Sequence, residues 1–182
     1  PSSGDKWQPC DLSRWFREEP PEVDWLFKDR IARGDVGLLI AVGGTGKTML
    51  CEELAVSAAC GRPLLQTFQP VKAMKVLFLA GEDNEIVLWT RMKRIVEAYA
   101  ISDYQKANVV QNLRIYAGKS EPLLICVQGV PMRTARYRWL QEQVAEFEPD
   151  LLILDPKARF DGTEENVASH ATAFVVAVEE IM

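Results

Sequence analysis

A glycine-rich turn between an apolar run and an apolar helix constrains this chain more than any other feature. Residues 36–50 read VGLLIAVGGTGKTML. The apolar residues Val36–Ile40 predict a buried strand, and Lys47 and Thr48 stand at the mouth of a helix. The glycines between them allow a ligand to approach the backbone closely, and successive N–H groups together with the helix dipole attract an anion. The stretch therefore predicts a phosphate-binding loop.

Each part of this loop has an expected role in binding a nucleotide. Lys47 would reach the β- and γ-phosphates, and the Thr48 hydroxyl would hold Mg²⁺. Ala41 takes the place of the usual first glycine, where a small residue can serve. A glycine-rich turn without a ligand is the alternative, and the flanking strand and helix argue against it. The residues expected to line the nucleotide are Val42, Gly43, Gly44, Thr45, Gly46, Lys47, Thr48 and Met49.

Composition limits the class of protein. The chain has 182 residues, of which 48% are hydrophobic and 26% charged, as expected of one globular domain. A net charge of −5 argues against a protein wholly devoted to coating nucleic acid. It does not exclude a local basic loop that contacts DNA. The four cysteines form no CxxC pair, and there is only one histidine, so the sequence lacks the Cys and His spacing of a zinc site. Without a transmembrane run or secretory signal, we expect a reduced, cytoplasmic protein with no membrane partner.

Strands and helices alternate along the chain. Apolar runs predict strands at 75–80, 113–116 and 151–154, with a further one possible at 123–127, and helical patterns cover 49–60, 85–99, 137–147 and 164–182. Strands that are apolar throughout indicate a parallel sheet covered on both faces, in an α/β fold over residues 31–182. We expect the aromatic residues of segment 1–30 to contact either this core or a neighbouring subunit, and core packing is favoured.

Two acidic residues follow predicted strands. Asp155 ends the apolar run at 151–154, at the sheet edge where open α/β folds place ligands, and would hold the same Mg²⁺ as Thr48. Glu82 ends the run at 75–80 and would orient and deprotonate a water, as a general base. Asp83 is a second polar contact or a favourable charge at a helix start. The alternatives are a turn residue at Asp155 and simple capping at Glu82 and Asp83.

These motifs together resemble one ATPase family. They comprise AVGGTGKT at 41–48, LAGED at 79–83 with Arg91 beyond it, LDPKARF at 154–160, EEN at 164–166 and ATAFV at 171–175. From about Trp25 to Met182 the chain resembles the RepA-type branch of RecA-like ATPases, typified by a plasmid-encoded hexameric replicative DNA helicase. The resemblance implies a RecA-like P-loop NTPase fold, a mostly parallel central sheet with helices on both faces, and ATP and Mg²⁺ as cofactors. It also implies that Glu82 activates water, that Asp155 serves Mg²⁺ and that Arg91 packs near adenine. Lys157 departs from the family's usual apolar residue.

The resemblance also implies partners and a longer chain. It predicts a homo-oligomeric, hexameric ring that contacts DNA through regions beyond this chain. In such ATPases a further strand follows the last helix and lies beside the phosphate-loop strand, so we expect the natural protein to continue past Met182. Two other functions stay open: a RecA/RadA-like recombination or regulatory ATPase, and a nucleotide-binding scaffold with little hydrolysis.

One basic cluster also leaves two interpretations open. Arg133, Arg136, Tyr137 and Arg138 could contact nucleic-acid phosphates, but a solvated start of an amphipathic helix is favoured.

Overall fold

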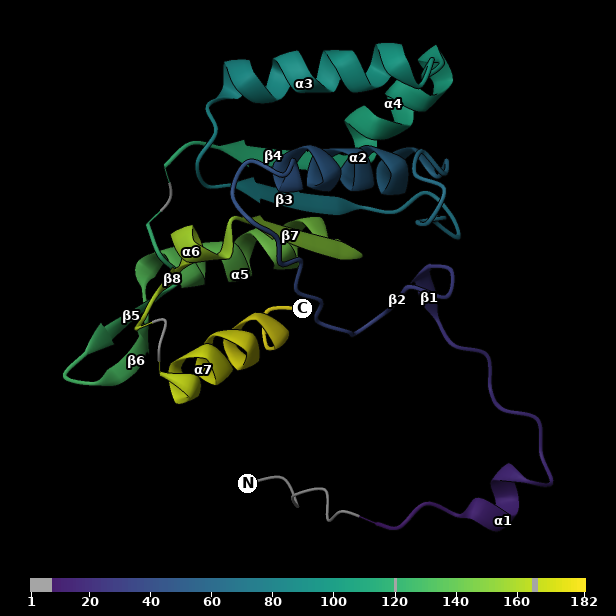
Figure 1. Cartoon of the computed structure of the whole chain (residues 1–182), viewed down its shortest axis with the longest axis vertical. Coiled ribbons are helices and arrows are strands. Elements are labelled where there is room, and N and C mark those ends of the chain that lie inside the picture. Colours follow the sequence, from purple (N-terminus) through teal and green to yellow (C-terminus); the bar gives the residue numbers. More distant parts are fainter. Residues whose placement is uncertain (1–7, 120, 165–166) are drawn as a thin grey trace.

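A three-stranded parallel sheet in the order β4-β3-β7 lies at the centre of the molecule (Figure 1). The computed structural model describes residues 8–119, 121–164 and 167–182. The sheet consists of β3 (Val76–Ala80), β4 (Leu113–Ala117) and β7 (Leu151–Asp155), as the apolar runs predicted. Ala80, the last residue of β3, pairs with Ala117 on one side and with Asp155 on the other. The carboxyl ends of all three strands therefore meet at one edge.

Alternate residues of β3 enter two separate cores. Val76 and Phe78 pack on the face covered by α2 (Lys47–Cys60), together with alanines of that helix. Leu77 and Leu79 pack on the opposite face, with side chains from α5 (Ala135–Phe147) and α7 (Ala168–Glu179). Neighbouring residues of a strand point to opposite faces of the sheet. Because helices cover both faces here, every residue of β3 is buried. The predicted α/β architecture, with a parallel sheet covered on both faces, is confirmed.

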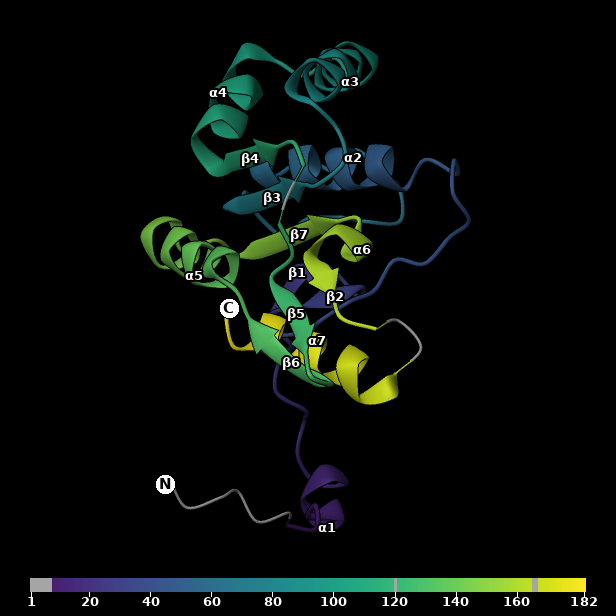
Figure 2. The same cartoon turned by 90° about the vertical axis from the view of Figure 1, so that its left-hand side faces the viewer.

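Two further helices lie outside α2 (Figures 1 and 2). They are α3 (Glu85–Ala98) and α4 (Asp103–Asn112), and a third cluster that includes Val56 and Ile95 joins α2 to α3. Asn84 caps α3 by accepting a hydrogen bond from Val87 N at 3.0 Å. Gly61 ends α2 with φ 69°, and the backbone of Ala73 occupies the space that a Cβ would need there.

The sheet is not continuous through the molecule. β5 (Leu124–Val127) forms where a strand was possible, but it pairs antiparallel with β6 (Val130–Arg133) and parallel with β8 (Asp161–Gly162) in a separate small sheet. The short helix α6 (Lys157–Phe160) links β7 to β8. α7 covers only part of the predicted 164–182 helix; of that stretch, Glu165 and Asn166 lie outside the described residues.

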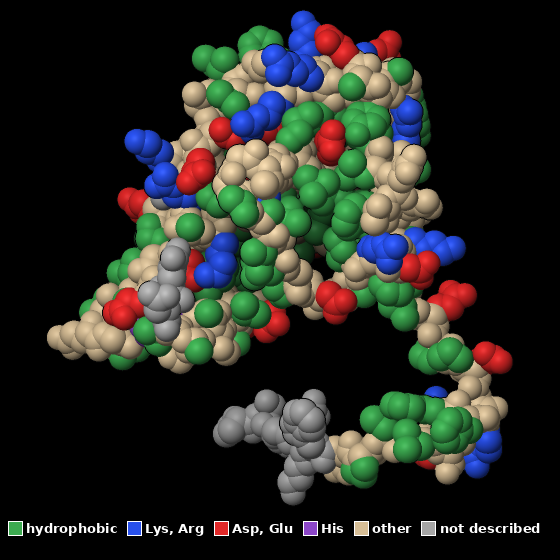
Figure 3. Space-filling view, in the orientation of Figure 1, with side chains coloured by type: hydrophobic (Ala, Val, Ile, Leu, Met, Phe, Trp, Pro, Cys, Tyr) green, Lys and Arg blue, Asp and Glu red, His purple; other side chains and the backbone are tan. Residues whose placement is uncertain are grey.

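The N-terminal segment divides into a packed and an exposed part. β1 (Trp25–Phe27) pairs with β2 (Ile31–Ala32), and Leu26 and Phe27 enter the core beside α2. The segment with α1 (Leu12–Trp15) stands apart from the body and presents apolar side chains to solvent (Figures 1 and 3). Trp15 is 62% exposed and Phe16 88% exposed, so the favoured packing on the core does not describe them. Trp7 lies outside the described residues.

The predicted strand at Val36–Ile40 is wrong. This segment is coil, with Leu38 66% and Ile40 80% exposed. Within the described residues β7 pairs only with β3, and the 36–40 segment joins no ladder. A strand exists only where a neighbour supplies its backbone hydrogen bonds, and apolarity alone predicts burial without supplying that neighbour.

Among the helices of the described residues, none is both long enough and apolar enough to cross a membrane.

Candidate functional site

The glycine-rich loop leads into a helix end that is open to an anion. Gly44 and Gly46 have φ 78° and 88°, in the left-handed region that favours glycine. The space that a Cβ would occupy at these two positions and at Gly43 is open. Gly46 is the N-cap of α2 and offers no side-chain hydrogen bond, so no cap competes for the N–H groups of the first turn. This local geometry suits the phosphate-binding role predicted from the sequence.

Lys47 folds back on its own loop. Its Nζ donates to the carbonyl oxygens of Ala41 at 2.7 Å and Val42 at 3.0 Å, and Thr45 Oγ1 donates to the same Val42 carbonyl at 2.8 Å. The ammonium group therefore lies against the loop that a phosphate would enter. Thr48 and Met49 follow in the half-buried first turn of α2.

Glu82 and Asp155 lie at the same edge of the sheet. Gly81 N donates to the Asp155 carbonyl at 2.8 Å, which joins the residue before Glu82 directly to the end of β7. In Figure 1 the loop before α2, the start of α3 and α6 all lie on the same side of the molecule, at this edge. Both acidic residues therefore lie at the carboxyl ends of neighbouring strands, where the apolar runs predicted them.

Asp155 is buried, and it lies near enough to α2 for its charge to act on Cys51 of that helix. Burial raises the pKa of the Cys51 thiol to about 12, and the nearby charges of Asp155 and Glu52 add to that rise. No hydrogen bond or ion pair within the described residues engages the Asp155 carboxylate, which leaves its oxygens free for a cation. Nowhere in the described part of the chain do three or more His, Cys, Asp or Glu side chains gather as a metal site. A Mg²⁺ ion here would fit Thr48, Asp155, water and phosphate oxygens, because Mg²⁺ typically takes few protein ligands.

Glu82 makes an ion pair that the sequence did not predict. Arg159 Nε, on α6, donates to Glu82 Oε1 at 3.0 Å, and both side chains are about half exposed. The two segments approach closely because residue 81 is glycine: a Cβ there would lie 2.9 Å from Arg159 Cβ and 3.1 Å from the Phe160 ring. The sequence does contain Arg159, four residues after Asp155, but no local pattern indicates that Arg159 would pair with Glu82.

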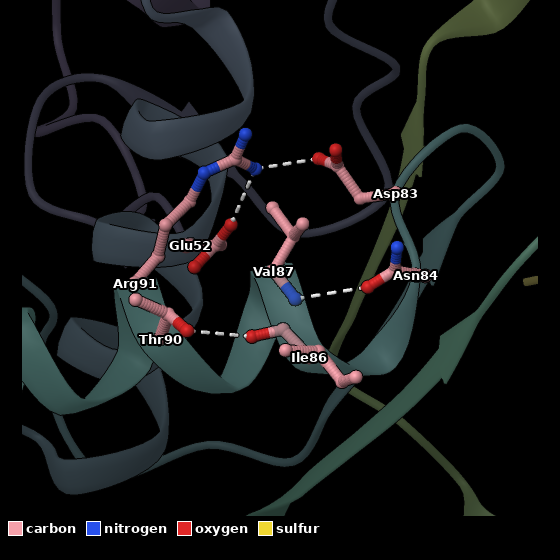
Figure 4. Close-up of polar contacts among 7 residues, drawn as sticks. All are labelled: Glu52, Asp83, Asn84, Ile86, Val87, Thr90 and Arg91. Carbon is pink, nitrogen blue, oxygen red and sulfur yellow. Dashed lines mark hydrogen bonds and ion pairs between the residues drawn. The ribbon is translucent and has the colours of Figure 1, made fainter.

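A buried carboxylate on α2 is the second feature that sequence reasoning missed (Figure 4). Glu52 is 0% exposed, and its Oε1 accepts a hydrogen bond from Arg91 Nη1 at 3.1 Å. The same nitrogen donates to Asp83, so Arg91, expected near adenine, is held between two carboxylates. Burial raises the pKa of Glu52 to about 7, and the hydrogen bond and charge of Arg91 only partly oppose that rise. The signal was a charged pair, Glu52-Glu53, within an otherwise apolar helix.

The basic cluster near α5 contacts other parts of the protein. Arg133 pairs with Glu180 and lies over the Tyr137 ring, with its Cζ 4.7 Å from the ring centroid. Arg136 stacks on Trp139 with its Cζ 3.7 Å from that centroid. The cluster begins an amphipathic helix, as favoured, but it is not wholly solvated: the Tyr137 side chain is buried, and its hydroxyl donates to the Ala177 carbonyl at 3.0 Å.

The chain also matches a model of a known protein family. The family model described as "AAA domain" matches residues 6–182, almost the whole chain.

Proposed function

The chain belongs to the AAA domain family, a family of RecA-like P-loop ATPases, and from this premise we propose that it is the motor domain of a RepA-like hexameric DNA helicase. ATP and Mg²⁺ are the cofactors of the proposal, since P-loop ATPases typically bind both. The observation that carries it is the sheet edge, where Asp155 ends β7 and Glu82 follows the end of β3 by two residues, on the side from which α2 begins. The hexamer, the helicase activity and the RepA branch rest on the resemblance of the sequence motifs.

The proposal gives each residue of the site a task. The loop N–H groups from Gly43 to Lys47 and the Lys47 ammonium bind phosphate oxygens. Thr48 and Asp155 hold Mg²⁺, which, when bound, would neutralise negative charge on the phosphates. Glu82 orients the attacking water and accepts its proton. Arg91 has a place near adenine through the resemblance alone.

A second candidate function is a nucleotide-binding scaffold with little hydrolysis. The observation that favours it is the ion pair between Glu82 and Arg159, because the guanidinium occupies a carboxylate oxygen that a base would use to bind the attacking water. On this alternative the chain binds ATP in the same loop but turns it over slowly.

Calorimetry with ATP and Mg²⁺ tests the site itself. We expect saturable binding to the chain, no binding to Lys47→Ala, and normal binding to Lys106→Ala, a control that removes an exposed lysine of α4 paired with Asp103. Equal binding by Lys47→Ala and the wild type would overturn the phosphate-loop assignment.

Turnover and assembly separate the two functions. If Glu82 is the base, Glu82→Gln should keep its affinity for ATP and lower kcat by about 10²- to 10⁴-fold. Sedimentation with ATP and unwinding of a forked DNA duplex test the hexamer and the helicase activity. Binding without measurable turnover or unwinding in the wild type favours the scaffold.

A further inference from the structure

Glu52 has no role in the proposed chemistry, yet it is a buried acid on the helix that follows the phosphate loop. Its Oε2 has no hydrogen-bond partner within the described residues, and only Oε1 is paired, with Arg91. Burial of a carboxylate is unfavourable unless its partners compensate, and a buried ion pair often contributes little to stability compared with apolar residues of similar size. Stability alone is therefore a weak reason for an acid at this position.

The contacts of Glu52 lead to the catalytic edge through one guanidinium group. Arg91 Nη1, on α3, donates both to Glu52 on α2 and to Asp83 in the loop between β3 and α3 (Figure 4). Asp83 directly follows Glu82, the proposed base. The next residue, Asn84, is fixed in turn by its hydrogen bond to Val87 N, so the loop is held at consecutive positions.

We infer that Glu52 and Arg91 are positioning residues, and that the Glu52–Arg91–Asp83 bridge fixes the loop carrying Glu82 relative to the phosphate-loop helix. The inference rests on the proposed ATPase function of this site. The distance between a base and a nucleotide-bound water depends on how the β3–α3 loop sits against α2, and this bridge joins those two elements. Neither Glu52 oxygen is exposed, so Glu52 acts only through Arg91 and never touches the nucleotide.

Loss of such a bridge should lower kcat more than it lowers the affinity for the nucleotide. A misplacement of about 1 Å of a catalytic group can lower the rate about 10²-fold, whereas phosphate binding depends on the loop and Lys47. If Arg91 instead contacted adenine, a substitution that removed this contact would raise KM. Variants of Glu52 separate the two roles because they release Arg91 without removing it.

The test compares Glu52→Leu with Glu53→Leu in the full chain. Glu53 is the next residue of α2, and its Oε1 accepts a hydrogen bond from Tyr99 Oη at 3.3 Å, at the far end of α3. We expect Glu52→Leu to lower kcat about 10- to 100-fold with KM within about 2-fold of the wild type, and Glu53→Leu to change neither. Glu52→Gln, whose amide oxygen still accepts from Arg91, should restore most of kcat. Asp83→Ala removes the acceptor at the other end of the bridge, in a partly exposed loop, and should reproduce the loss if Glu52→Leu does not fold.

Amide hydrogen exchange in the 81–85 segment gives a readout independent of turnover. We expect exchange about 10-fold faster in Glu52→Leu, or in Asp83→Ala where Glu52→Leu does not fold, than in the wild type and Glu53→Leu. Equal exchange and equal kcat in the compared variants, or a raised KM with unchanged kcat, would overturn the bridge. Failure of the proposed function appears separately, as ATP binding that survives Lys47→Ala.

Discussion

At the scale of single residues, Glu52 is the acid whose protonation most clearly couples to folding. Its pKa rises from 4.5 to about 7 on folding, so the folded state holds the proton more tightly than the unfolded state does. The resulting stability is fully present below about pH 4.5 and is lost as the pH rises through about 7, a change of about 3 kcal/mol. We expect Glu52→Gln to lack this dependence. Urea unfolding between about pH 5 and pH 8 measures the difference from the wild type.

The neighbouring acid supplies the control for this pH dependence. Glu53→Gln makes the same change at the next residue of α2, whose side chain is only partly buried and contacts Tyr99 instead of Arg91, so it is the matched control. If the wild type and Glu52→Gln changed in parallel between pH 5 and 8, the raised pKa of Glu52 would be wrong.

The sequence predicted residues of the site better than it predicted their partners. Glu82 and Asp155 could be placed because each ends an apolar run, and strand ends meet at one edge of a parallel sheet. The pairs Glu82–Arg159 and Glu52–Arg91 could not, because they join residues 77 and 39 positions apart. A contact over such a separation depends on how α6 and α3 pack, which no local pattern specifies.

At the scale of elements, α4 shows what a short polar helix depends on. It carries no buried residue, and it begins with a capping box in which Ser102 Oγ accepts from Gln105 N and the Gln105 side chain accepts from Ser102 N. We expect Ser102→Ala to lower the free energy of unfolding by about 1 kcal/mol. Chemical denaturation measures this, with Ser13→Ala as the control, since Ser13 is exposed in the isolated segment around α1.

Elements were predictable where burial and local chemistry agreed. The strands β3, β4 and β7 and the helices α2 and α5 follow apolar patterns, and α2 ends at Cys60, as predicted. α4 was missed because it lacks an apolar face, although the S-x-x-Q capping signature at 102–105 was present in the sequence. The 36–40 strand failed for the opposite reason: its residues are apolar, but no neighbour in the described residues supplies a ladder.

At the scale of the whole molecule, ligand binding should appear as stability. A nucleotide that binds only the folded state at about 100 times its Kd contributes about 2.7 kcal/mol, which raises the Tm of a domain of this size by about 5–10 °C. We expect this rise with ATP and Mg²⁺ for the wild type and Lys106→Ala, and none for Lys47→Ala. Thermal unfolding followed by circular dichroism measures it, with Mg²⁺ alone as the blank. An equal rise in Lys47→Ala would place the nucleotide elsewhere.

The exposed N-terminal segment extends the distance from the folded body at which the molecule can contact a partner. Fully extended, the stretch of residues 16–24 between the Trp15 and Phe16 rings and β1 would span about 30 Å, whereas a compact domain of about 150 residues has a radius of gyration of about 15 Å. The pairing of β1 with β2 anchors one end of this tether beside α2, and Trp15 and Phe16 are the apolar groups it carries outward. Those two rings can therefore meet a surface that lies well outside the folded body to which they are attached.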